Sequence, residues 1–226
     1  MAVGKSIIER LRAYTSCDVA DALSKLGYPH GGFLSNIIMY SPLMQSGDTK
    51  IIGEAYTVKF APINHRNDPV PANHFIDTIP KDAILFISAP PDQPNGVYGG
   101  LMSMRAQYLG AKGTIIDGRF RDLQEHREIG YPVFARAVGT SAAAEVCFPS
   151  QISVPVRLNS TRQEAWIRPG DYLFGDLNGV VCIPREAAEK CLEIIPGIVD
   201  ADNQCAQDIK NGASFAEVLK WHKGKL

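Results

Sequence analysis

One arginine and two carboxylates stand close together just after an apolar stretch of the chain. Arg121 and Asp122 are adjacent, and Glu125 follows Asp122 at a spacing of three. If a helix starts near Arg121, the two carboxylates share one of its faces. Carboxylate oxygens suit Mg²⁺ or Mn²⁺, and the planar guanidinium group suits an anion. The spacing therefore indicates a divalent-metal site beside an anion site, although charges at a helix start are also typical of a solvated face.

A pair of glycines precedes this cluster. Gly99 and Gly100 open the segment 101–109, whose apolar residues have helical spacing. Residues without side chains at a helix N-terminus expose backbone N–H groups to an incoming anion. The pair alone is also typical of a plain turn. The prediction of a site depends on the glycine pair and the charged cluster lying side by side.

The elements around these residues predict that they do. Apolar strands are expected at 83–88, 114–117 and 131–138, with helices at 101–109 and 122–129 between them. Strands that alternate with helices indicate βαβ units and a parallel sheet. Ligands of such sheets bind beyond the carboxyl ends of the strands. The glycine pair and the charged cluster follow two consecutive strands, so they are expected at one edge.

The remaining chain supplies other elements. Two short helices are expected between Ser6 and Leu26, and a strand at 51–61. Short strands with tight turns are expected from about residue 152. From Arg185 to about Asn211 the chain is expected to be helical, with a break near Pro196-Gly197, and a last short helix follows.

Composition restricts the class of protein. The chain has 226 residues, 45% of them hydrophobic, and a formal net charge of -1. We expect a single domain over 1–226, with no electrostatic attraction to nucleic acid or to an anionic membrane. No apolar run approaches the ~20 residues of a membrane span, and a cytoplasmic location is the default. Five widely spaced cysteines predict buried free thiols rather than disulfides or a zinc site.

Several familiar catalytic motifs do not occur in the sequence. It contains no phosphate-binding G-x-x-x-x-G-K-[ST], no G-x-G-x-x-G after a strand and no G-x-S-x-G nucleophile motif. A lysine base or Schiff base stays open as an alternative, with Lys59 the nearest case to a lysine in an apolar strand.

The spacing of the cluster resembles a family pattern. Gly100, twenty further residues, Arg121-Asp122, two residues and Glu125 match the G/D-x20-R-D-x2-E/D pattern of RraA-like proteins. This family includes class II 4-hydroxy-4-methyl-2-oxoglutarate aldolases. The supporting matches are "SCDVADAL", "GAKGTIIDGRFRD", "GYPVFARAV" and "PGDYLFGDLNGVVCIP". The resemblance covers roughly residues 15–212.

The resemblance implies a fold and an assembly. The expected fold is α/β, a layered β/β/α sandwich of the swivelling-domain type with N- and C-terminal helices. The expected assembly is a homo-oligomer, a trimer or a hexamer built as a dimer of trimers.

The resemblance also implies roles for individual residues. Asp122 is expected to anchor Mg²⁺ or Mn²⁺, and Glu125 to join the water-filled surroundings of the metal. Arg121 is expected to contact the 2-oxo acid substrate and its enolate oxygen. The substrate carboxylate is expected on the backbone of four residues: Gly99, Gly100, Leu101 and Met102. In such aldolases a neighbouring subunit adds an acid from its C-terminal helix, and Asp202 is the candidate here.

The activity that this resemblance implies is metal-dependent cleavage of 4-hydroxy-4-methyl-2-oxoglutarate to pyruvate, with oxaloacetate decarboxylation as a side activity. Several such aldolases carry an acid at the position of Gly100, so this chain lacks one proton acceptor. Two alternatives stay open. The first is an aldolase for another 4-hydroxy-2-oxo acid, with His65, Arg66 and His74 at the distal end of the substrate. The second is a non-catalytic regulator that binds a ribonuclease or helicase partner.

Overall fold

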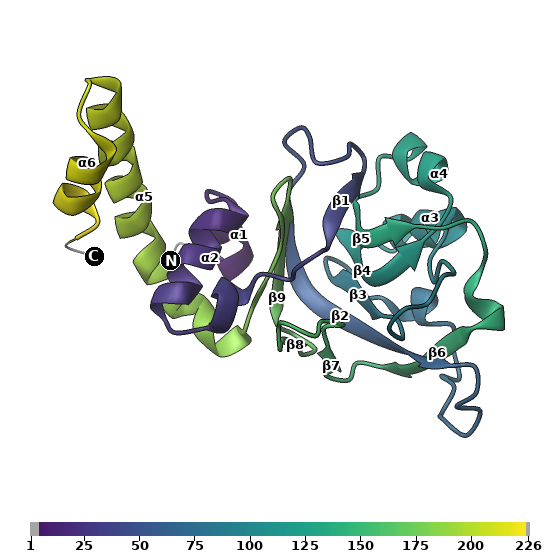
Figure 1. Cartoon of the computed structure of the whole chain (residues 1–226). Helices are drawn as coiled ribbons and strands as arrows, with labels where there is room; N and C mark the ends of the chain where they lie inside the picture. The colour runs from purple at the N-terminus through teal and green to yellow at the C-terminus, as the bar shows by residue number, and fades with distance from the viewer. Residues whose placement is uncertain (1–4, 225–226) are drawn as a thin grey trace.

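Eight strands form one mixed sheet through the larger part of the molecule (Figure 1). The computed structural model describes residues 5–224. The strand order is β1-β5-β4-β3-β2-β9-β10, and β6 pairs with β2 beside this path. The helices α3 (Gly100–Tyr108) and α4 (Leu123–Glu128) lie on one face of the sheet. The N-terminal and C-terminal helices form a separate layer on the far side of β9.

The half of the sheet that carries α3 and α4 is parallel. Its strands are β2 (Ile51–Pro62), β3 (Ile84–Ser88), β4 (Gly113–Phe120) and β5 (Val133–Val138). Each pairs in parallel with the next, whereas β1 (Ile38–Ser41) joins β5 antiparallel. The βαβ units predicted from the sequence are confirmed. The strand predicted at 114–117 continues to Phe120 because its pairing with β5 extends to Val138.

The sheet curves until it nearly closes on itself. The long strand β2 pairs with β9 (Tyr172–Asp176) at its start and with β6 (Cys147–Ile152) at its end. Strand β10 (Gly179–Ile183) follows β9 in a hairpin. The N–H of Leu34 donates to the carbonyl of Val180 across 2.8 Å, so the segment leading into β1 lies along β10. A separate ribbon of β7 (Val156–Arg157) and β8 (Trp166–Ile167) adds to the short strands expected beyond residue 152.

Three apolar cores give the layers. Leu85 of β3 packs in a core with the helices α3 and α4, and its neighbour Phe86 packs in a second core between the two halves of the sheet. Both faces of β3 are therefore buried, as expected for a parallel strand with a continuous apolar run. Ile183 belongs to a third core under the terminal helices. These cores confirm the expected α/β fold with β/β/α layers and N- and C-terminal helices.

Two short helices form the N-terminal part, as predicted. They are α1 (Ile7–Leu11) and α2 (Ser16–Lys25). The Thr15 Oγ1 accepts the N–H of Asp18 at 3.2 Å, and the Asp18 carboxylate accepts the N–H of Thr15 at 2.7 Å. This reciprocal capping box fixes where α2 begins. The helix ends before Gly27, whose φ of +83° lies in the left-handed region that glycine enters most easily.

The C-terminal part is one long helix and one short one, α5 (Ala188–Lys210) and α6 (Phe215–His222). The predicted break near Pro196-Gly197 is wrong, because α5 continues through Pro196. A proline removes one helical hydrogen bond, to the carbonyl four residues earlier. Ile195 and Ile198 are buried in the third core on either side of the proline, and this packing keeps the helix continuous.

The other helical segments are single 3₁₀ turns: Pro29–Gly32, Phe75–Thr78, Ala143–Glu145 and Arg185–Ala187. Within residues 5–224, no helix has the length and apolar character that crossing a membrane requires. All five cysteines are free thiols; Cys17 is exposed and the other four are buried. Burial is therefore confirmed for every cysteine except Cys17.

Candidate metal and substrate site

The glycine pair and the charged cluster lie against each other. The N–H of Val97 donates to the carbonyl of Arg119 at 2.9 Å, and the N–H of Arg121 donates to the carbonyl of Tyr98 at 2.9 Å. These two bonds attach the loop before α3 to the end of β4. The predicted neighbourhood of the two features is thus present in the chain.

Asp122 turns its carboxylate toward α3 rather than toward its own helix. Its backbone is left-handed, with φ +63° and ψ +40°, and its side chain makes no cap bond to α4. The Asp122 Oδ2 accepts the backbone N–H of Gly100 at 3.1 Å. The helix expected at 122–129 is present as α4, but Asp122 lies just outside it in a left-handed conformation. Asp122 and Glu125 therefore do not share a helix face, and they meet instead at the start of α3.

Close approach explains the two glycines. A Cβ atom on Gly99 would lie 2.5 Å from the Asp122 Oδ2, and a Cβ atom on Gly100 would lie 1.8 Å from the Glu125 Oε2. Real Cβ atoms are not found at such distances from oxygen. The two carboxylates thus occupy the space that side chains at positions 99 and 100 would need.

Arg121 adds a positive charge to the same point. Its Nε lies 3.5 Å from the Asp122 Oδ2, and the side chains of Arg121 and Asp122 are 41% and 30% exposed. Both groups are open to a ligand, and the Asp122 carboxylate is also held by the N–H of Gly100. An arginine beside two carboxylates can bind the anionic end of a substrate while the carboxylates bind a cation.

The donor set fits a hydrated Mg²⁺ or Mn²⁺ ion. Among residues 5–224, no cluster of three or more His, Cys, Asp or Glu side chains is arranged to hold a metal. Mg²⁺ commonly takes only one or two carboxylates and keeps several waters. Asp122 and Glu125 are two such hard oxygen ligands at one place. They would hold the ion, and the other positions would be left for water and substrate.

The backbone of Gly99–Met102 is partly engaged already. The N–H of Gly100 donates to Asp122, and the N–H of Met102 donates to the carbonyl of Gly99 at 3.1 Å. Among the described residues, the N–H groups of Gly99 and Leu101 have no acceptor. The substrate cradle expected on Gly99, Gly100, Leu101 and Met102 stays a prediction, and these two N–H groups are its unoccupied donors.

A buried histidine behind the site was not predicted to have a role. His126 is fully buried; its Nε2 lies 2.7 Å from the carbonyl oxygen of Arg121 and its Nδ1 lies 2.8 Å from the Ser103 Oγ. Because a carbonyl can only accept, Nε2 carries the proton. Burial lowers the pKa of His126, which favours the neutral ring. The histidine thus links Arg121 to α3.

This link continues into a group of buried hydroxyls. The Ser103 Oγ lies 3.1 Å from the Tyr98 hydroxyl, which also contacts the Thr114 Oγ1 at 3.0 Å. Burial raises the pKa of Tyr98 to about 12, so its hydroxyl stays protonated. The sequence signal for this network is weak: His126 lies four residues after Asp122, and a histidine in a charged run is typical of a solvated surface.

Arg119, two residues before Arg121, and three residues weighed as alternatives in the sequence lie elsewhere. Arg119 is within β4 rather than beyond its end, and its Nη1 donates to the carbonyl of Val138 at 3.0 Å. Lys59 is exposed on β2. The His65 Nδ1 lies 3.7 Å from the Asp68 Oδ2, and the His74 Nδ1 accepts the N–H of Ile76 at 3.3 Å. The substrate contacts suggested for the loop 62–74 stay a prediction.

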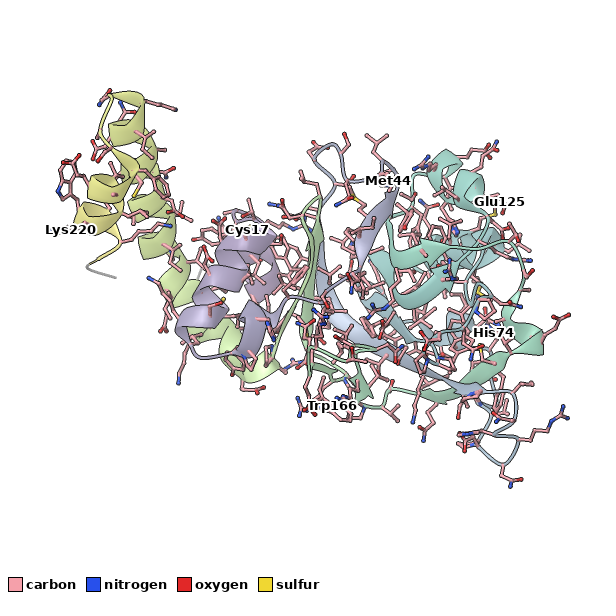
Figure 2. All side chains as sticks on the ribbon, viewed as in Figure 1. Cys17, Met44, His74, Glu125, Trp166 and Lys220 are labelled. Carbon is pink, nitrogen blue, oxygen red and sulfur yellow. The ribbon has the colours of Figure 1, made fainter. Side chains whose placement is uncertain are left out.

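Asp202 is not part of the same-chain site. It lies in α5 and forms an ion pair with Lys223. The helices α5 and α6 extend at the opposite end of the molecule from α3 and α4, as the positions of Lys220 and Glu125 show (Figure 2). The contribution of Asp202 from a neighbouring subunit stays a prediction.

Comparison with known proteins identifies the family. A family profile described as RraA-like, Aldolase/RraA, matches residues 16–182, which contain the glycine pair and the charged cluster of the site. The chain belongs to the RraA-like family. The sequence-based resemblance is thereby confirmed.

Curated relatives of this RraA-like chain match it at modest identity. Protein DlpA of Legionella pneumophila is 27% identical over 94% of this chain, and a putative 4-hydroxy-4-methyl-2-oxoglutarate aldolase of Halalkalibacterium halodurans is 29% identical over 64% of it. An uncharacterized Methanocaldococcus jannaschii protein, MJ0644, is 32% identical over 54% of the chain. The matches span 33%, 64% and 57% of these relatives' own lengths, in the same order.

Solved structures share the fold. An uncharacterized protein from Pseudomonas syringae has a TM-score of 0.79 at 24% identity, covering 96% of this chain and 98% of its own. RraAS2 of Streptomyces coelicolor, described as an unusual member of the RNase ES inhibitor RraA family, has a TM-score of 0.73 at 20% identity, covering 94% and 99%. At these identities the likeness establishes the RraA-like fold and nothing finer.

Proposed function

We propose that this RraA-like protein is a divalent-metal-dependent class II aldolase. It cleaves 4-hydroxy-4-methyl-2-oxoglutarate, or a related 4-hydroxy-2-oxo acid, to pyruvate, and it decarboxylates oxaloacetate as a side activity. The observation that carries the proposal is the convergence of Asp122, Glu125 and Arg121 on the glycines that open α3. A relative named as a putative aldolase of this kind supports the assignment.

Asp122 and Glu125 would hold the Mg²⁺ or Mn²⁺ ion. When bound, the ion acts as a Lewis acid that polarises the 2-oxo group of the substrate. The N–H groups of Gly99 and Leu101 have no acceptor among the described residues, so they are available to bind the carboxylate of the substrate. Arg121 places its guanidinium where negative charge develops on the keto oxygen as the carbon–carbon bond breaks.

Glu125 is the group best placed to take the proton of the 4-hydroxyl. Its Oε2 lies where the Cβ atom of a side chain at position 100 would be. Glu125 therefore supplies a carboxylate close to the position at which several related aldolases carry an acid. The carboxylate takes the proton directly or through one water molecule as the bond breaks. Decarboxylation of oxaloacetate needs the same charge stabilisation by Arg121 and no hydroxyl proton transfer.

The proposed enzyme is a homo-oligomer, a trimer or a hexamer, with Asp202 of one subunit close to the site of the next. Asp122, which would hold the metal, and Arg121 are partly exposed, so a neighbouring chain could reach them. Oligomers of soluble proteins are usually symmetric rings or dimers, and a ring would repeat such a contact at each interface.

A coupled pyruvate-release assay tests the proposal. The substrates are several 4-hydroxy-2-oxo acids and oxaloacetate, each with EDTA, with Mg²⁺ and with Mn²⁺. We expect turnover with metal and none with EDTA, and restoration when the metal is added back. A complete absence of turnover on all substrates with either metal would sink the aldolase assignment and favour a non-catalytic binding protein.

A further inference from the structure

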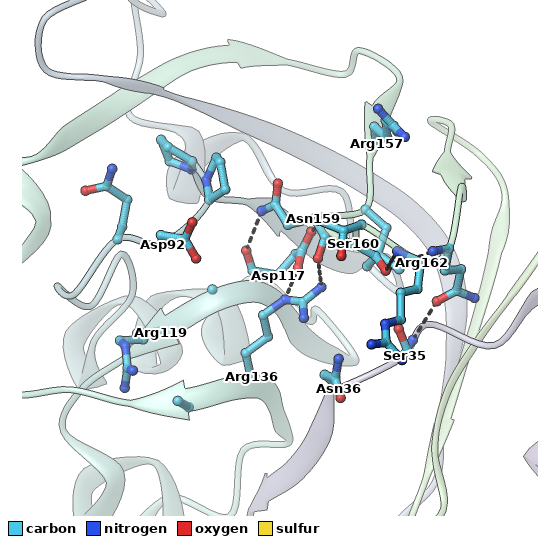
Figure 3. A pocket seen from close by; sticks show the side chains of 18 of the residues that line it. Ser35, Asn36, Asp92, Asp117, Arg119, Arg136, Arg157, Asn159, Ser160 and Arg162 are labelled. Atoms are coloured by element: carbon cyan, nitrogen blue, oxygen red, sulfur yellow. Dashed lines mark hydrogen bonds and ion pairs between the residues drawn. The ribbon is translucent and has the colours of Figure 1, made fainter.

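A cavity lies on the face of the sheet opposite α3. Its volume is about 1090 Å³. Asp117 and Arg119 of β4 and Arg136 of β5 form its floor, and its walls are the segments 33–36, 90–94 and 157–163 (Figure 3). Side chains alternate between the faces of a strand, so Arg119 points away from the core that contains Phe120 and α3. The cavity is separate from the candidate metal site.

Asp117 and Arg136, the two floor residues that pair with each other, are firmly tied to the cavity wall. Asp117 is fully buried, pairs with Arg136, and accepts the backbone N–H of Asn159 at 2.6 Å. The Asn159 Nδ2 donates to the carbonyl of Ala89 at 2.6 Å, and the Arg136 guanidinium donates to the carbonyl of Asn159. These bonds fix the wall at 157–163 to the sheet, so the cavity has a preformed shape.

The remaining charge of the cavity is positive. Four arginines and two aspartates line it. After Asp117 is paired with Arg136, three arginines remain against Asp92: Arg119, Arg157 and Arg162. Within residues 5–224, none of these three guanidinium groups has a carboxylate within 4 Å. This local excess of positive charge stands in a chain whose formal net charge is -1.

The arginines are spread along the cavity. In Figure 3, Arg119 and Arg162 lie on either side of Arg136. Phe33 also lines the cavity and is 39% exposed, which provides an apolar surface. Pockets for small ligands measure roughly 300–1,000 Å³, so the space exceeds what a three-carbon oxo acid would fill.

We propose that this cavity binds a small organic polyanion, a molecule with two or more phosphate or carboxylate groups and an apolar part. Arg119 and Arg162 hold separate anionic groups through planar, charge-assisted hydrogen bonds. Phe33 contacts the apolar part. The site is independent of the metal and of the proposed aldolase reaction.

Isothermal titration calorimetry on the full chain tests this site. The probes are pyrophosphate, ADP and citrate, each titrated into protein that a chelating resin has freed of metal, so that no metal can recruit an anion to Asp122 and no chelator competes for the cavity. We expect saturable binding of at least one probe, weakened about tenfold in Arg119→Gln and in Arg162→Gln. Stronger binding of ADP and pyrophosphate would identify a phosphate ligand, and stronger binding of citrate a polycarboxylate.

Two control variants separate the cavity from other positive groups. Arg12→Gln removes the same charge from an exposed position outside the cavity, and Arg121→Gln removes it from the candidate metal site. Both are expected to bind the probes as the parent does. The proposal is overturned if no probe binds saturably, if Arg119→Gln and Arg162→Gln bind as tightly as the parent, or if Arg121→Gln alone abolishes binding.

Discussion

The carboxylate of Glu125 occupies the space beside the Cα atom of Gly100. A Cβ atom added at Gly100 would lie 1.8 Å from the Glu125 Oε2 and 2.8 Å from the Glu125 Cβ. The backbone at Gly100 is otherwise ordinary helix, with no positive φ. The close approach at Gly100 therefore reflects the position of the neighbouring carboxylate and not a special backbone conformation of the glycine.

Gly100→Ala is expected to displace Glu125 and to lower the turnover number about tenfold or more. The free energy of unfolding should fall by about 1–3 kcal/mol through overpacking, measured by urea denaturation. Gly197→Ala is the matched control, because a Cβ atom there meets nothing within 4 Å in α5. The control should keep full activity and gain up to about 1 kcal/mol. Full activity in Gly100→Ala would contradict the role of Glu125.

Asp122→Asn removes the negative charge of Asp122 while keeping its left-handed backbone conformation. Asparagine tolerates the left-handed conformation, and its side-chain oxygen can still accept the N–H of Gly100. We expect normal stability, weaker Mn²⁺ binding by calorimetry, and activity reduced about a hundredfold or more. Asp122→Ala should lose the same activity and also about 1–2 kcal/mol of stability, since alanine is strained at positive φ. Unchanged Mn²⁺ affinity in Asp122→Asn would rule out its metal role.

His126→Phe is expected to destabilise the protein because it breaks the link between the carbonyl of Arg121 and Ser103 of α3. The carbonyl of Arg121 and the hydroxyl of Ser103 would be buried without a partner on that side, at a cost of about 2–4 kcal/mol in total. His222→Gln is the control: its partner Asp208 is near the surface, so the loss should stay within about 1 kcal/mol. Urea denaturation of both variants measures the difference, and equal midpoints would refute a structural role for His126.

The sequence predicts the βαβ units and the neighbourhood of Gly100 and Asp122 because these depend on short-range patterns. Apolar runs mark the strands, and consecutive parallel strands end at one edge. The left-handed turn at Asp122 could not be predicted, since it depends on the contact of its carboxylate with α3. The continuous α5 was missed for a similar reason: buried neighbours hold Pro196 within the helix. Long-range packing decided both features.

The position of Arg119 also could not be predicted from the sequence. From its position in the sequence it belongs with Arg121, two residues later. Because β4 continues to Phe120, Arg119 lies on the face of the sheet opposite α3 and lines the arginine-rich cavity. β4 ends three residues later than expected, and this places Arg119 in the cavity instead of beside Arg121. No local sequence pattern marks where the pairing of a strand stops.

The proposed role of Asp202 can be tested by mixing two defective proteins. The Asp202→Asn protein keeps Asp122, and the Asp122→Asn protein keeps Asp202. If each site combines Asp122 of one subunit with Asp202 of the next, a shared oligomer contains some intact sites. Random assembly of equal amounts should make about a quarter of the sites complete. Restored pyruvate release after subunit exchange measures this recovery.

The same experiment distinguishes a shared site from one within a single chain. If Asp202 acted on Asp122 of its own chain, every site in the mixture would carry one substitution, and no activity would return. If Asp202 only pairs with Lys223, the Asp202→Asn protein would be fully active before mixing. Because this ion pair is exposed, its loss should change the free energy of unfolding by about 1 kcal/mol or less. A low activity of Asp202→Asn could then not be attributed to unfolding, and recovery on mixing would place Asp202 in the site of the neighbouring subunit.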